Sequence, residues 1–179
     1  EHLDDRLFLT MKMFTVSKSD KHFEEEHVSF ILGKEYLLTF QEREGDDFHV
    51  IRERINARVG KTRSKGSDYL LYLLVDRIVD NYYLVMDAFE DIMDNLEEEL
   101  INGPQQDMAE KILQQKKNLT QLRKFIYPLR EEFGRLIKDE GDLITKSSIA
   151  YFRDIYDHLI HLTNTIENYR ENMNGLMEL

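Results

Sequence analysis

Residues 151–179 read YFRDIYDHLIHLTNTIENYRENMNGLMEL, and this stretch decides the expected fold. Its apolar positions recur in alternating steps of three and four, and they are Phe152, Ile155, Leu159, Leu162, Ile166, Tyr169, Met173 and Leu176. This spacing is typical of a long helix with one apolar seam, about 44 Å in length at ~1.5 Å per residue. Neither a Gly–Pro stop nor a basic last turn ends the pattern, and the chain begins without Met. We therefore expect a piece of a larger protein that continues beyond Leu179.

Two further long helices are predicted upstream by the same rhythm. The first covers residues 67–100, with seam positions Leu71, Val75, Ile78, Tyr82, Val85, Phe89, Ile92 and Leu96. The second covers residues 105–138, and Pro128 inside it should kink the helix because proline lacks the backbone donor. We expect these two helices to form an antiparallel hairpin.

The first 60 residues have a different pattern. Residues 7–14, 28–32 and 35–41 are strand-like, and residues 47–58 are helix-like. Gly33-Lys34 suits a two-residue type II′ hairpin loop. Bulky apolar groups on both strand faces indicate a sheet that is covered on both sides. The expected fold class is α+β, with the C-terminal part of an α/β sandwich domain at 1–60, a helical hairpin at 61–140 and a stalk helix at 141–179.

Composition excludes several classes of function. The net charge is −11, from 35 acidic and 24 basic residues, which disfavours nucleic acid as a partner. The absence of cysteine excludes disulfides and thiolate zinc sites. No apolar run reaches the ~18 residues of a membrane span. No phosphate loop, nucleophile elbow or HExxH motif is present, so we do not expect an enzyme.

Paired metal-ligand types stand out on the helices. Asp154 and His158 are four residues apart and share a helix face, and Asp157 repeats this spacing with His161. Asp76 and Asp80 form a similar acidic pair. Such pairs can share a hard cation such as Mg²⁺, which needs only one or two carboxylates. Taken alone, such a pair is more often part of a solvated face in which Asp supports a protonated His.

Uncharged polar residues occupy the polar face of the helix predicted at 151–179. They are Thr163, Asn164, Thr165, Asn168, Asn172 and Asn174. They suit either the lining of a wet channel or a face that a neighbouring helix covers.

Six segments of the sequence carry a resemblance to a known family. They are VSFILGKEYLLTFQE (28–42), FHVIRERI (48–55), SDYLLYLLVDRIVDNYY (67–83), LEEEL (96–100), LRKFIYPLRE (122–131) and residues 151–179. The chain resembles the cytoplasmic portion of CorA-type magnesium and cobalt transporters. The six segments occur in the same order and at the same spacing as in that family, and they cover nearly the whole chain.

The resemblance implies a homopentamer around a pore, on the cytoplasmic side of the inner membrane, whose missing C-terminal helices cross that membrane. In this family, Mg²⁺ or Co²⁺ bound between neighbouring cytoplasmic domains holds the channel closed, and the stalk helix gates the pore. By resemblance, Asp154 is a regulatory ligand, His158 belongs to a second site and Asp76 is similarly placed. Glu178 stands where an acidic residue faces the pore axis, and Asp157 remains a further candidate through its spacing.

The sequence departs from the family in one respect that bears on metal binding. The family's main partner for the stalk Asp is an acidic residue upstream of the first strand, and this chain lacks it. We therefore expect weak affinity for Mg²⁺. Two alternatives stay open, namely a zinc transporter of the same superfamily, because Zn²⁺ favours imidazole, and a coiled-coil interaction module without a channel.

Overall fold

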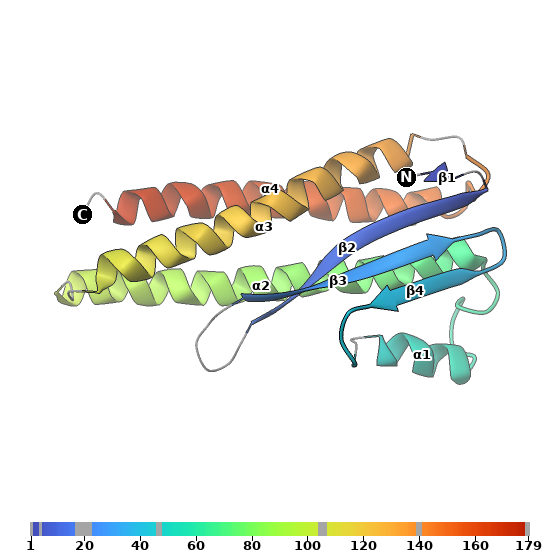
Figure 1. Ribbon diagram of the computed structural model, residues 1–179, viewed down its shortest axis with the longest axis horizontal. Helices are drawn as coiled ribbons and strands as arrows, with labels where there is room; N and C mark the ends of the chain where they lie inside the picture. Colours follow the sequence, from blue (N-terminus) through green and yellow to red (C-terminus); the bar gives the residue numbers. More distant parts are fainter. Residues whose placement is uncertain are drawn as a thin grey trace.

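The computed structural model describes residues 2–3, 5–16, 23–45, 48–103, 107–138 and 141–177. A small antiparallel sheet lies against three long helices (Figure 1). In chain order the elements are β1 (His2–Leu3), β2 (Arg6–Val16), β3 (Phe23–Leu32), β4 (Leu37–Gln41), α1 (His49–Asn56), α2 (Ser67–Asn102), α3 (Met108–Leu136) and α4 (Ile149–Leu176). This is the predicted α+β fold, with the strands first and the long helices after them.

The sheet has the order β1-β2-β3-β4, and β2 and β3 pair over ten positions from Leu7 opposite Leu32 to Val16 opposite Phe23. Both strands are longer than predicted, because β3 includes the acidic run FEEE at 23–26. An ion pair between Lys12 of β2 and Glu25 of β3 accompanies the backbone pairing there. Alternating hydrophobicity could not reveal this extension.

The β3–β4 turn differs from the predicted Gly33-Lys34 loop. Leu32 pairs with Leu37, and the Gly33 N–H donates to the Tyr36 carbonyl at 2.9 Å, so Lys34 and Glu35 form the tip. Gly33 does not adopt a positive φ; instead, a Cβ at this position would lie 2.4 Å from the Tyr36 ring. A side chain at this position would therefore require the Tyr36 ring to move, and the glycine precedes the tip of the turn instead of forming it.

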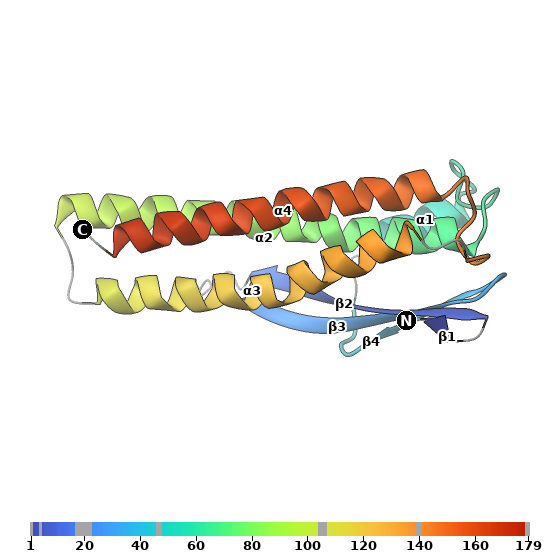
Figure 2. The ribbon, with the colours of Figure 1, turned by 90° about the horizontal axis from the view of Figure 1, so that it is seen from above.

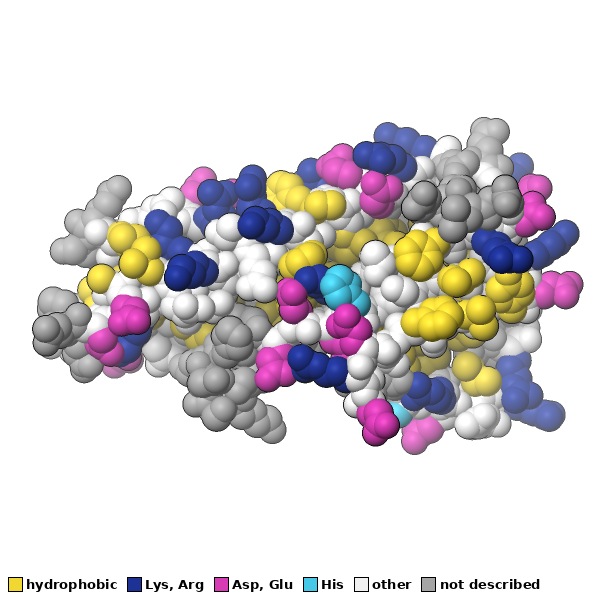
Figure 3. Space-filling model, viewed as in Figure 1, with side chains coloured by type: hydrophobic (Ala, Val, Ile, Leu, Met, Phe, Trp, Pro, Cys, Tyr) yellow, Lys and Arg dark blue, Asp and Glu magenta, His cyan; other side chains and the backbone are white. Residues whose placement is uncertain are grey.

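α2 and α3 cover one face of the sheet, and no element among the described residues covers the other face (Figure 2). Within the described residues, the prediction of a sheet covered on both sides was therefore wrong. Val28, Phe30 and Leu32 are fully buried on the helix side. On the open side, Leu38 and Phe40 are 48% and 54% exposed. Apolar side chains gather on the surface over the strands (Figure 3).

The helices bury the seams that the sequence predicted, and α2 also anchors the sheet. The Tyr82 hydroxyl donates to the Lys12 carbonyl, and the Phe14 N–H donates to the Asn81 side chain at 3.1 Å. α3 packs mostly against α4 and little against α2. It runs through Pro128 without a break and bends toward α4 (Figure 2). Among the described residues, no helix combines the length and apolarity that crossing a membrane requires.

Candidate metal site

Asp76 of α2 is the centre of the candidate site. Burial raises the pKa of its carboxyl, and the neighbouring charge of Asp80 raises it further. Two residues of α4 act on the same carboxyl, since His158 lowers its pKa and Asp154 raises it. We call Asp76, Asp80, Asp154 and His158 the Asp76 cluster. Because Asp80 and Asp154 disfavour the charge of Asp76, a bound cation would stabilise the ionised form of Asp76.

Two tyrosines of α2 support the cluster. The Tyr72 hydroxyl donates to Asp76 Oδ2 at 3.4 Å, and burial together with the charge of Asp76 raises the pKa of Tyr72 to about 12. Tyr83 donates from its hydroxyl to the backbone carbonyl of His158 at 3.2 Å. Its ring lies 5.8 Å from the rings of both His158 and His161. These contacts fix α4 against α2 where the candidate ligands lie.

The structure brings the predicted ligands together only in part. Asp154 and His158 are exposed on α4 near half-buried Asp76, so helical spacing predicted their common surface correctly. Asp157 is also exposed, and it is not among the groups that chiefly shift the pKa of Asp76. No group of three or more Asp, Glu or His side chains is close enough to hold a metal within the part of the chain that is described. Glu178 lies outside the described residues.

The sequence pattern did not predict that Tyr72 and Tyr83 contact the candidate ligands. Tyr72 is one turn before Asp76, a spacing that could have indicated the hydrogen bond. Tyr83 contacts a different helix, which no local pattern reports.

The uncharged polar residues of α4 were predicted either to line a channel or to be covered by a neighbouring helix, and the structure treats them differently. Thr163 is 1% exposed and is covered by α3, whose Arg130 donates to its hydroxyl at 3.2 Å. Asn164, Asn168 and Asn172 are exposed. The covered-face reading is therefore correct for Thr163, and a channel lining remains a prediction for the asparagines.

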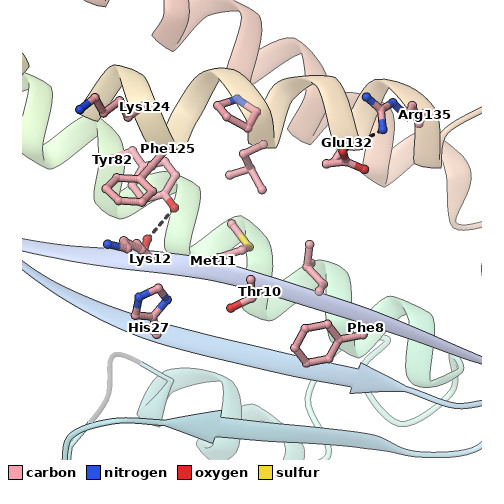
Figure 4. A pocket seen from close by; sticks show the side chains of 13 residues that line it. Phe8, Thr10, Met11, Lys12, His27, Tyr82, Lys124, Phe125, Glu132 and Arg135 are labelled. Carbon is pink, nitrogen blue, oxygen red and sulfur yellow. Dashed lines mark hydrogen bonds and ion pairs between the residues drawn. The ribbon is translucent and has the colours of Figure 1, made fainter. Parts of the chain in front are cut away.

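A separate groove between β2 and α3 does not suit a metal cation. It has a volume of about 600 Å³ and is lined by apolar residues such as Met11 and Phe125 (Figure 4). The Lys12 ammonium lies 3.7 Å from the centre of the Phe125 ring. Glu132 is the one carboxylate among its described lining residues, and Arg135 donates to it at 3.0 Å.

Comparisons with known proteins agree with this architecture. The whole chain, residues 1–179, matches the family model described as a CorA-like Mg²⁺ transporter protein. It is 42% identical over 179 residues to the cobalt/magnesium transport protein CorA of Thermotoga maritima, covering all of this chain and 51% of that protein. It is 27% identical over 155 residues to the putative metal ion transporter YfjQ of Bacillus subtilis, covering 87% of this chain and 48% of that protein.

Solved structures show the same fold at low sequence identity. The soluble domain of CorA from Methanocaldococcus jannaschii matches with a TM-score of 0.85 at 22% identity, over all of this chain and 71% of that one. The ZntB cytoplasmic domain from Vibrio parahaemolyticus matches with a TM-score of 0.79 at 16% identity, over 98% of this chain and 68% of that one. The chain spans about half the length of the curated relatives that it matches. On the full-length family match and the 42% identity, the chain belongs to the CorA-like family of Mg²⁺ transporter proteins.

Proposed function

We propose that this chain is the cytoplasmic regulatory region of a pentameric divalent-cation transporter. In this proposal the region senses intracellular Mg²⁺ and controls the pore through α4. The observation that carries it is the Asp76 cluster, in which a half-buried carboxylate of α2 has a raised pKa beside Asp80 and the exposed ligands of α4. Family membership supports transport, and it favours this reading over a coiled-coil module without a channel.

The donor chemistry of the cluster fits Mg²⁺. This ion keeps several waters and is bound through one or two carboxylates rather than by a complete protein cage. Asp76 and Asp154 would supply these carboxylates, and His158 lies beside them. The absence of a closed three-residue site among the described residues agrees with a site that a neighbouring subunit completes.

The proposed switch requires a difference in affinity between two states. A cation shared by carboxylates of two subunits stabilises the closed pairing only if it binds that pairing better than the open one. When Mg²⁺ leaves, the carboxylates repel one another and the α4 helices separate.

The test uses the full-length protein that contains this chain, with protease cleavage of α4 followed over a Mg²⁺ titration. The Asp76→Ala and Asp154→Ala variants should each raise the Mg²⁺ concentration for half-maximal protection by about tenfold or more, because each loses one of few carboxylate ligands. Glu171→Ala, on an exposed position of the same helix, is the control. Equal protection of all four proteins would overturn the proposal.

A zinc transporter is the second candidate, and the two imidazoles beside Tyr83 favour it. Zn²⁺ binds imidazole more readily than Mg²⁺ does. Uptake of Mg²⁺, Co²⁺ and Zn²⁺ by the full-length protein separates the candidates. Zn²⁺ uptake that exceeds Mg²⁺ uptake and falls in His158→Ala would favour the zinc reading.

A further inference from the structure

A polar network joins the middle of α3 to α4 on a side of α4 that the candidate metal site does not use. Its hub is Glu167 of α4. Glu167 Oε1 accepts from Arg123 Nε at 2.8 Å and from the Tyr127 hydroxyl at 2.6 Å, both on α3. Its other oxygen accepts from Arg170, one turn along α4. The carboxylate therefore binds donors from both helices at once.

The aromatic ring of Tyr127 contacts two arginines of α3. The guanidinium carbons of Arg123 and Arg130 lie 4.7 and 5.0 Å from the centre of this ring. Arg130 then reaches α4 through the buried hydroxyl of Thr163. Such cation–π contacts hold an arginine in place and reduce the freedom that it loses on pairing.

The spacing on the two helices is matched. Residues 123, 127 and 130 of α3 are separated by four and three positions, and so are residues 163, 167 and 170 of α4. Each set therefore occupies one face of its helix. We call these six residues the α3–α4 latch.

The connection between α3 and α2 is different. α3 packs little against α2, and their polar link is the ion pair of Lys111 with Glu99 at 2.8 Å, near the connection between the two helices. The C-terminal half of α3 is thus held to α4, while the described ion pair with α2 lies at its beginning.

We propose that the α3–α4 latch makes α3 and α4 move as one body, with Glu167 as the positioning residue. The proposal concerns the mechanics of the chain and does not require a bound cation. Its consequence for gating, that a displacement of α4 carries α3 with it, rests on the proposed function.

The magnitude of the interactions requires a network rather than a single pair. Arg123 and Glu167 keep 45% and 34% of their side-chain surface exposed, and an isolated exposed ion pair contributes little to stability. The Tyr127 hydroxyl, Arg123 and Arg170 together hold the pKa of Glu167 below its ordinary value, the hydrogen bond from Tyr127 being the largest cause. Because Glu167 binds several donors at once, substitutions at two members of the latch should have non-additive effects on the unfolding constant.

The experiment measures amide hydrogen exchange along the 179-residue chain without Mg²⁺. Glu167→Gln should speed exchange in residues 120–133 by about threefold or more while residues 71–89 of α2 stay unchanged, because the local opening of α3 becomes easier. Glu171→Gln is the matched control, on an exposed position one turn further along α4. An equal rise of the exchange rates in all three helices would mean that Glu167 stabilises the whole chain, and this would overturn the proposal. Unchanged exchange rates would overturn it as well.

A double-mutant cycle supplies the second measurement. Arg123→Ala and Glu167→Ala should be non-additive in the unfolding constant by about fivefold, the size that coupling within one network commonly reaches. Tyr127→Phe keeps the ring and removes the hydroxyl, so it should weaken the coupling without abolishing it. Additive effects of the two alanine substitutions would contradict the latch, and this outcome is separate from any failure of Mg²⁺ regulation.

Discussion

Asp68 is a buried acid, only 2% exposed, whose carboxylate joins the start of α2 to the segment before α4. Its Oδ2 accepts from both the backbone N–H and the hydroxyl of Thr145, at 2.9 and 2.8 Å. Its Oδ1 accepts from the Tyr69 N–H at 2.8 Å. Burial alone would raise the pKa of Asp68, but the hydrogen bonds from Thr145, Ser148 and Tyr69 outweigh it and lower the pKa.

A pH-dependent contribution to stability follows at this residue. A lowered pKa in the folded state stabilises the protein above about pH 4, and this contribution is lost as the pH falls through the folded pKa. Asp68→Asn should therefore cost about 2 kcal/mol at pH 7 and progressively less below pH 4. Urea unfolding across pH 3–7 measures the difference, with the exposed Asp87→Asn as control. A difference that does not vary with pH would contradict this assignment.

The candidate ligands show which features of the site the spacing of residues can predict. Helical spacing placed Asp154 and His158 on one face, and it paired Asp76 with Asp80, because positions four apart are neighbours on any helix. The packing of Tyr83 against His158 and His161 had no such signal, since it joins residues on different helices.

At the scale of the element, α2 is the helix on which both the sheet and α4 are placed. Its seam was predicted from the sequence, and every seam position from Leu71 to Leu96 is buried. The predicted hairpin partner is a weaker neighbour than expected, because α3 bends toward α4 and packs mainly there. The period of a sequence identifies the buried face of a helix but not which helix covers it.

Two leucines of α2 test whether the predicted seam is the buried face of this helix. Leu71 is fully buried and Leu84 is 58% exposed. Leu71→Ala should destabilise the chain by about 2–5 kcal/mol through lost burial and the cavity it leaves. Leu84→Ala should change stability by no more than about 0.5 kcal/mol. Chemical denaturation of both variants measures this, and similar losses at the two positions would show that the seam is misplaced.

At the scale of the whole molecule, the open face of the sheet is the main departure from expectation. Phe8, Ile31 and Leu38 lie in neighbouring positions across β2, β3 and β4, and Phe40 is opposite Ser29 on the same face. The apolar residues that suggested a doubly covered sheet are real, but no element among the described residues covers them.

An apolar surface of this kind should bind a hydrophobic dye. The double variant Leu38→Thr and Phe40→Thr should reduce the fluorescence of bound anilinonaphthalene sulfonate by about half or more, because exposed apolar patches are the usual binding sites of such probes. Its stability should change by no more than about 1 kcal/mol, since both side chains are already exposed. Val59→Thr, exposed outside the sheet, is the control. Unchanged dye binding with intact folding would show that the face is not the accessible surface.

The sequence by itself determined the class of fold, the helical seams, the likeness to the CorA family and the surfaces on which the candidate ligands lie. These properties follow from local periodicity and from motifs, which are written in consecutive residues. The division into three domains and the oligomeric state stay predictions. Only the tertiary structure decided the register of the β3–β4 turn, the open face of the sheet, the pairing of α3 with α4 and the latch around Glu167. Each of these depends on contacts between residues far apart in the chain, where side-chain packing and charge decide among arrangements that the local pattern leaves equal.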